Sequence, residues 1–197
     1  SSLSSSSQVI LDGHNDEEFS NIVQEIFNQT TTLVLHPHLN PNTTGSVYSA
    51  RPIAVDAWLE RGQHLEYALI QPKWIWKAKP RLDPEGLSNV RQKNCLRGIE
   101  LLDITRILKM ENTGRDIQSF AKPSHCFFVH SIHNEEYCFE AKSKTERDRI
   151  VRSLKLLIAR FGAKVLTGDP LVYYEFFWIR QAAPGKALNL NDVFTEK

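Results

Sequence analysis

Residues 143–166 read SKTERDRIVRSLKLLIARFGAKVL, and this stretch decides the fold. Ser143 is a preferred helix N-cap residue, and Glu146 follows three positions later, which is the pattern of a capping box. Apolar residues then recur at helical spacing, so the stretch predicts one long amphipathic helix. Gly168 and Pro170 predict where that helix ends. The apolar positions are Ile150, Val151, Leu154, Leu157, Ile158, Phe161 and Val165.

Several short segments with strand character precede this helix. Residues 65–71 and 73–79 have β-prone composition, residues 98–110 predict one or two strands, and residues 126–132 with 137–141 predict a hairpin. Short strands closed by a single C-terminal helix are typical of a mainly β domain. We therefore expect a barrel or sandwich of about seven strands capped by the helix, with extensions at both ends.

Four regions are expected along the chain. Residues 1–15 predict a disordered tail, and residues 16–56 predict an N-terminal extension. Within that extension, residues 16–28 predict a short amphipathic helix, which must dock on the rest of the protein because it is too short to be stable alone. The capped β domain is expected over residues 57–166, and residues 167–197 form a C-terminal aromatic extension.

The composition excludes several classes of protein. None of the 197 residues belongs to an uncharged apolar run long enough to cross a bilayer. Three scattered cysteines, Cys95, Cys126 and Cys138, predict reduced thiols in a cytoplasmic protein, one able to associate peripherally with a membrane.

No catalytic or metal-binding motif is evident in the sequence. His36 and His38 flank a proline, but a zinc site needs further ligands, and the spacing suggests none. Glycine-flanked serine nucleophiles, phosphate-binding glycine loops and zinc-protease motifs are also missing from the sequence. The sequence therefore predicts a protein that is not an enzyme and uses no metal or cofactor.

Charge is unevenly distributed along a chain whose net charge is +1. Residues 1–56 carry −5, whereas residues 73–97 carry +5. The basic segment predicts one of three things: a solvated face, a site for anionic phospholipid headgroups, or a site for an acidic protein partner. Nucleic acid is not expected, because Trp74 and Trp76 fit a sheet core better than a stacking platform. The candidate headgroup-binding residues are Lys73, Lys77, Lys79, Arg81, Arg91, Lys93 and Arg97.

An aromatic stretch, LVYYEFFWI, follows the long helix at residues 171–179. It is long for an unpaired surface segment. Two interpretations remain open at this point: the stretch packs back onto its own domain, or it contacts a protein partner. The candidate partner-binding residues are Tyr173, Tyr174, Phe176, Phe177 and Trp178.

Four motifs between residues 59 and 161 resemble those of a pleckstrin homology (PH) domain. They are LERGQHL at 59–65, which resembles an opening strand, ELLDITRI at 100–107, FAKPSHCFF at 120–128, and SKTERDRIV at 143–151. The pattern resembles most the PH domain of phosphoinositide-specific phospholipases C. Phosphotyrosine-binding domains and related protein-binding modules have the same fold. This resemblance implies a binding module.

Two departures from the PH pattern bear on function. The tryptophan typical of the closing helix is replaced by Ile150 or Val151, and no basic residue occurs at 66–69, where lipid-binding members would grip inositol phosphates. The first functional hypothesis is recruitment or scaffolding at an anionic membrane surface through phosphoinositide or other acidic headgroups. The alternative is a protein-interaction subunit without a lipid site, whose working surfaces are residues 16–28 and 171–179.

Overall fold

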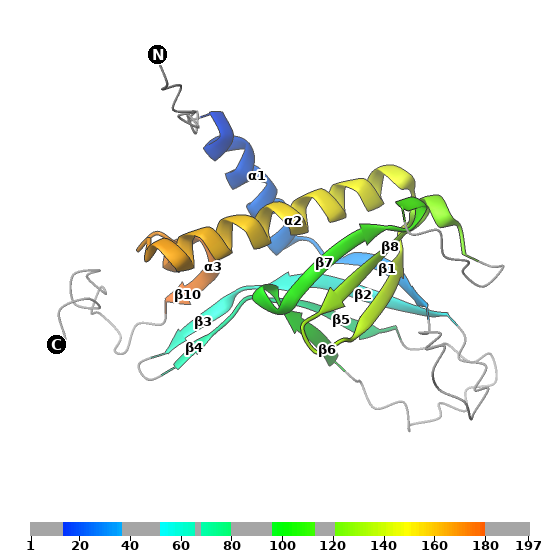
Figure 1. The fold of residues 1–197 in the computed structure, drawn as a ribbon, viewed down its shortest axis with the longest axis horizontal. Helices are drawn as coiled ribbons and strands as arrows, with labels where there is room; N and C mark the ends of the chain where they lie inside the picture. The colour runs from blue at the N-terminus through cyan, green and yellow to red at the C-terminus, as the bar shows by residue number, and fades with distance from the viewer. Residues whose placement is uncertain (1–13, 37–51, 66–67, 80–95, 113–120, 180–197) are drawn as a thin grey trace, which may run out of the picture.

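The protein is described here by a computed structural model covering residues 14–36, 52–65, 68–79, 96–112 and 121–179. Figure 1 shows a strongly bent sheet with one long helix lying across it. The elements are α1 (His14–Asn28), β1 (Thr31–His36), β2 (Ile53–Glu60), β3 (Gly62–Leu65), β4 (Ala68–Ile70), β5 (Lys73–Ala78), β6 (Leu96–Glu100), η1 (Leu101–Asp103), β7 (Ile104–Lys109), η2 (Met110–Asn112), η3 (Pro123–His125), β8 (Cys126–Ser131), β9 (Glu136–Glu140), α2 (Lys144–Thr167), α3 (Val172–Phe176) and β10 (Phe177–Ile179).

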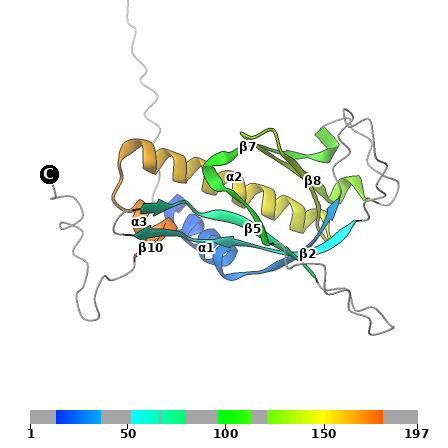
Figure 2. The same cartoon turned by 90° about the horizontal axis from the view of Figure 1, so that it is seen from below.

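The main sheet has seven strands in the order β6-β5-β2-β1-β9-β8-β7. Strand β1 joins two antiparallel meanders, because it pairs with β2 on one side and with β9 on the other. Strands β6 and β7 are not paired with each other, so the sheet bends around its core without closing (Figure 2). The prediction of a mainly β sandwich of about seven strands with a C-terminal helix is confirmed.

Helix α2 begins and ends as the sequence indicates. The Ser143 hydroxyl accepts a hydrogen bond from the Glu146 amide at 3.1 Å, and the Glu146 carboxylate accepts one from the Lys142 amide at 2.9 Å. At the other end Gly168 adopts a left-handed conformation, with φ of 65°, which a residue without a Cβ reaches at no steric cost. The helix therefore has a defined start and stop.

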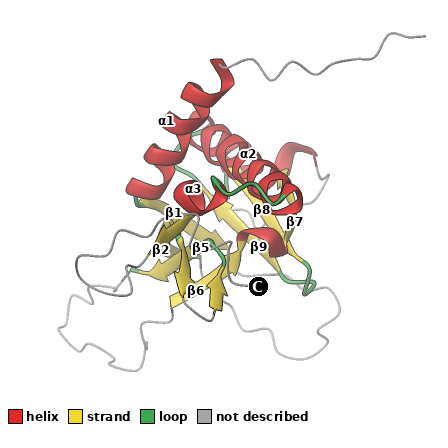
Figure 3. Cartoon of the chain, turned by 90° about the vertical axis from the view of Figure 1, so that its left-hand side faces the viewer, coloured by secondary structure: helices red, strands yellow, loops and turns green. Residues whose placement is uncertain are grey.

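The core lies between α2 and the concave face of the sheet (Figure 3). The α2 residues Leu154 and Leu157 are fully buried, and Phe161 is 1% exposed. Trp74 and Trp76 of β5 belong to the same core, which confirms the expectation that they are packed in the sheet. The apolar stripe of α2 thus covers the concave face of the bent sheet.

The sheet includes residues that we expected in an N-terminal extension. Strand β1 is its central strand, and β2 begins at Ile53, so a boundary at residue 57 falls inside β2. The motif at 59–65, expected to open the domain, spans the end of β2 and all of β3, which lie in different sheets. The opening strand is β1, and a helix, α1, precedes it and contacts β2 and α2.

A second, small sheet forms where the C-terminal segment returns to the domain. Its order is β10-β3-β4, with β10 parallel to β3 and β4 antiparallel to it. The register places Phe177 beside Gly62 and Trp178 beside Gln63. The small sheet fixes residues 177–179 against the hairpin that follows β2.

Two glycines should respond in opposite ways to a single methyl group. A Cβ on Gly62 would lie 2.4 Å from the Ile70 carbonyl oxygen and 2.6 Å from the Phe177 ring, so Gly62→Ala should destabilise the fold by about 1–3 kcal/mol. A Cβ on Gly162, inside α2, would meet only Leu102 at 3.7 Å, so Gly162→Ala should stabilise by about 0.5–1 kcal/mol. Urea denaturation of both variants measures the difference, and equal effects would contradict the packing at Gly62.

Candidate functional site

The structure describes four of the seven candidate headgroup-binding cations and distributes them over two faces. Lys73, Lys77 and Lys79 share one face of β5 and the residue just past its end, with Ile75 between the first two on that face. Arg97 pairs directly with Trp76, so it projects from the opposite face of the sheet. Arg81, Arg91 and Lys93 lie outside the described residues.

Two acidic side chains offset most of the charge of the lysine row. Lys73 forms an ion pair with Glu100 at 3.0 Å, and Lys79 forms one with Asp56 at 3.0 Å. Asp56 also lies opposite Lys77 in the β2–β5 register. Desolvation raises the pKa of Asp56, but the hydrogen bonds from Lys79 and Thr32 and the charge of Lys79 together outweigh it, so the pKa lies below its usual value. The described part of the basic segment is therefore a mixed-charge surface.

The aromatic segment packs mostly into the core. Phe176 is fully buried and Phe177 is 3% exposed, so neither can be part of a contact surface, and the prediction for these two residues is wrong. Tyr173 is half-buried, with its ring edge-on to His64 at 4.9 Å. Of the five candidates, Tyr174 and Trp178 remain exposed.

The other predicted partner surface, the helix at residues 16–28, also faces its own domain. Phe19 is buried, 6.5 Å from the Phe176 ring and under the Arg160 guanidinium. Ile26 and Phe27 pack against the same core. The apolar face of α1 is therefore used in folding, in the way that its short length requires.

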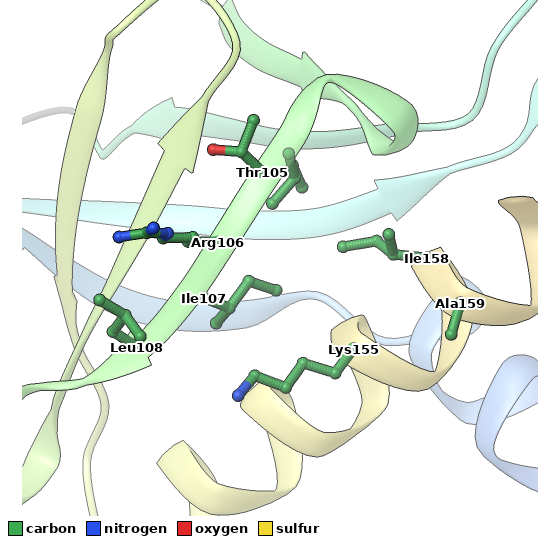
Figure 4. Close-up of a pocket in the computed structure, with 8 residues that line it drawn as sticks. Thr105, Arg106, Ile107, Leu108, Lys155, Ile158 and Ala159 are labelled. Carbon is green, nitrogen blue, oxygen red and sulfur yellow. The ribbon is translucent and has the colours of Figure 1, made fainter. Parts of the chain in front are cut away.

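A groove lies instead between β7 and α2 (Figure 4). Strand β7 is the last strand of the seven-stranded sheet, so one of its edges is paired with β8 and no described strand pairs with the other. The groove has a volume of about 440 Å³. Its lining residues are Ile104, Thr105, Arg106, Ile107, Leu108, Lys155, Ile158 and Ala159.

A bulge in β7 explains how the groove is shaped. The pairing of β7 with β8 shifts between Ile104 and Arg106, which leaves Thr105 as an extra residue. Without the shift, Ile104 and Ile107 would face opposite sides of the sheet, but with it both are buried. The strand therefore keeps two isoleucines inside while Thr105 and Arg106 remain exposed.

The chemistry of the groove combines apolar and cationic groups. Ile158 and Ala159 of α2 stand across from β7, and Lys155 lies one turn before them (Figure 4). Arg106 and Lys155 are the cations in the lining, and its other members are neutral. Such a surface can pack apolar side chains and attract negative charge.

An ion pair fixes α2 to β7 at one end of the groove. Lys109 of β7 contacts Asp148 of α2 at 2.7 Å, and the buried Arg147 contacts the same carboxylate at 2.8 Å. The hydrogen bond from Lys109 lowers the pKa of Asp148, and Arg147 acts in the same direction.

The lowered pKa of Asp148 predicts a pH-dependent contribution to stability. A depressed folded-state pKa stabilises the fold above the unfolded-state pKa, and that contribution is lost as pH falls through the folded-state pKa. Asp148→Asn should therefore destabilise the protein at neutral pH and lose its effect in acid. Urea denaturation of both proteins across the acidic range measures this, and a pH-independent difference would contradict it.

Sequence reasoning did not find this groove, although its parts were visible. Ile104 and Ile107 belong to the motif at residues 100–107, which predicts a strand. Ile158 belongs to the apolar face of the predicted helix. No local signal shows that β7 ends the sheet, because edge position depends on the pairing of all the strands. The spacing of two isoleucines three apart in a predicted strand was the available hint of a bulge.

The fold defined by these elements is that of a PH-like domain, as the resemblance implied. No family model and no curated protein matches the chain. Among solved structures it is similar to the inner membrane complex sub-compartment proteins ISP3 and ISP1 of Toxoplasma gondii. For ISP3 the identity is 14%, the coverage 73% of this chain and 85% of that chain, and the TM-score 0.41. For ISP1 the identity is 10%, the coverage 81% of this chain and 98% of that chain, and the TM-score 0.42.

The C-terminal PH domain of human pleckstrin is similar as well, at 14% identity, with 80% of this chain and 93% of that chain covered and a TM-score of 0.39. Similarity at this level supports no inference about ligands. The closer likeness to phospholipases C stays a prediction. Among the described residues, no helix combines the length and the apolar character needed to cross a membrane.

Proposed function

We propose that this PH-like module binds an extended peptide segment of a partner protein in the groove between β7 and α2. The observation that carries the proposal is a sheet edge with no described strand beside it, next to an apolar groove of about 440 Å³. An extended peptide can add to such an edge as a further strand. Its main-chain hydrogen bonds then supply affinity, and alternate side chains enter pockets that supply specificity.

The groove residues favour a particular kind of peptide. Ile107, Leu108 and Ile158 offer apolar surface for one or two aliphatic or aromatic side chains. Arg106 and Lys155 favour an acidic residue beside them. The proposed ligand is therefore an extended segment with alternating apolar and acidic residues.

Filling the groove should abolish peptide binding while the domain remains folded. Peptides are first selected from a displayed random library with the wild-type protein, and their affinities are measured by fluorescence anisotropy. Ala159 is exposed on α2, so Ala159→Trp can occupy the groove without disturbing the core. The expected loss of affinity is at least about tenfold, or about 1.4 kcal/mol.

Matched variants separate the groove from general effects. Ala163→Trp makes the same change at another exposed α2 position that does not line the groove, and it should leave affinity unchanged. Lys155→Glu should weaken acidic peptides, whereas Lys142→Glu, also exposed, should not. Equal losses in the paired variants, or no enriched peptides at all, would refute the proposal.

The lipid hypothesis makes the opposite prediction for the same variants. It assigns binding to the basic segment, in which acidic partners already contact Lys73 and Lys79. If headgroups are the ligand, anionic vesicles should bind in a salt-sensitive way, Lys77→Glu should reduce that binding, and Ala159→Trp should leave it intact. We expect little preference for anionic over neutral vesicles, because Glu100 and Asp56 offset two of the three positive charges of the described lysine row.

A further inference from the structure

Four side chains with metal-binding chemistry lie together on the outer face of the main sheet. In β9, Cys138 and Glu140 are two residues apart and so share a face. His36 of β1 lies directly opposite Cys138, and Cys126 of β8 lies directly opposite Glu140. Cross-strand partners project to the same side, so strand register alone brings the four together.

The distances within this group suit a metal ion. Ligand atoms of His36, Cys126 and Glu140 all lie within 4.8 Å of one another, and a His36 Nε2–Glu140 Oε2 contact measures 2.8 Å. Zinc bonds of about 2.0–2.3 Å in a tetrahedral site place neighbouring ligand atoms about 3.3–3.8 Å apart. Small side-chain rotations therefore separate His36 from Glu140 and bring Cys126 closer. Cys138 is not one of these three, but its thiol hydrogen-bonds Cys126, so a side-chain rotation would bring it to the same ion.

The group is buried and incompletely satisfied. His36 is 5% exposed and Cys126 is fully buried, whereas the Glu140 side chain is 15% exposed. His36 Nδ1 has no hydrogen-bond partner among the described residues, although buried polar atoms in native proteins usually have one. The histidine–carboxylate pair is hydrogen-bonded and neutral thiols are commonly buried, so the unpartnered imidazole nitrogen is the costly polar atom of the group.

We infer that His36, Cys126 and Glu140, with Cys138 as fourth ligand, form a structural zinc site that joins β1, β8 and β9. Cysteine, histidine and carboxylate ligands are those that zinc accepts in tetrahedral sites. Each thiol loses its proton when it binds, so zinc uptake releases two protons.

Such a site would strengthen the weakest seam of the sheet. Strand β1 pairs with β9 over only three residue pairs, and that pairing links the two meanders. Glu140 also holds the turn before β8, since its carboxylate accepts from the Lys122 amide. Cys126 donates to the Lys122 carbonyl in the metal-free chain and gives up that bond when its thiol loses the proton to bind zinc. Zinc binding to the folded chain should therefore raise its melting temperature.

Cobalt substitution in the reduced, metal-stripped full chain tests the site. One Co²⁺ per chain should bind with thiolate-to-cobalt charge-transfer absorption and tetrahedral visible bands, and Zn²⁺ should displace it. His36→Ala and Cys126→Ala should abolish these bands, and Cys138→Ala should roughly halve the charge-transfer intensity. Cys95→Ala and His133→Ala are the matched controls and should leave the spectrum unchanged; the His133 side chain is 67% exposed.

A second measurement uses the wild-type chain, so its result does not depend on whether the variants fold. In urea concentrations that expose the buried thiols of the metal-free chain to alkylation, zinc should protect Cys126 and Cys138, but not Cys95, as mapped by mass spectrometry. Absence of cobalt–thiolate bands, bands that survive Cys126→Ala, or thiol protection that does not depend on zinc would each overturn the inference. A Cys126–Cys138 disulfide in protein purified without reductant, with no cobalt binding after reduction, would also overturn it.

Discussion

Phe176→Ala should cost about 3–5 kcal/mol of unfolding free energy, which is a large part of the stability of a domain this size. The Phe176 side chain is fully buried, and its ring lies 5.0 Å from Phe161 of α2 and 6.5 Å from Phe19 of α1. Truncation would therefore leave a cavity where α1, α2 and α3 meet. Urea denaturation followed by tryptophan fluorescence measures the loss.

Trp178→Ala is the matched control, two residues further along the same segment. Trp178 is 61% exposed and lies 5.6 Å from the Arg61 guanidinium, so its truncation should cost less than about 1 kcal/mol. Similar costs for Phe176→Ala and Trp178→Ala, or no measurable cost for Phe176→Ala, would contradict the assignment of the aromatic segment to the core.

Glu175→Ala should destabilise the fold by about 2–3 kcal/mol at neutral pH, because hydrogen bonds to charged groups are the stronger ones. The carboxylate accepts from Arg160 Nε and Nη2 at 3.1 and 2.9 Å and from Lys164 at 2.8 Å. Lys164 is 8% exposed, so removal of Glu175 leaves a nearly buried ammonium with Asp169 as its remaining ion-pair partner. Chemical denaturation measures the loss.

The control for Glu175 is an ion pair at the surface. Glu25 of α1 pairs with Arg149 of α2, and both side chains are more than 40% exposed. Glu25→Ala should therefore cost less than about 1 kcal/mol. If Glu175→Ala costs no more than Glu25→Ala, the C-terminal segment is not held to α2 by its carboxylate.

The parts of the fold with local signals were predictable from sequence. The capping box at Ser143 and the helix stop at Gly168 depend on a few neighbouring residues, and both are present. Strand β5 could be placed because Trp74 and Trp76 lie at alternate positions, flanked by Lys73 and Lys77. These features are set by local backbone preferences and by the periodicity of apolar residues, and both can be read from a single sequence.

The features that depend on distant pairing were not predictable. The domain start was placed near residue 57 because nothing local shows that β1 inserts between β2 and β9. The basic segment looked like a patch because the register that brings Glu100 and Asp56 to its lysines is not local. His36 and Glu140 are 104 residues apart, so spacing rules for metal ligands could not join them.

The most direct test of the proposed function is amide hydrogen exchange of the full chain with and without a selected peptide. Strand addition should slow exchange in residues 104–109, because β7 amides at the unpaired edge would gain hydrogen-bond partners. The surrounding α2 residues 155–159 should become protected as well. Peptide binding that leaves 104–109 unchanged and protects residues 68–79 or 171–179 instead would contradict the proposal that this edge is the binding site.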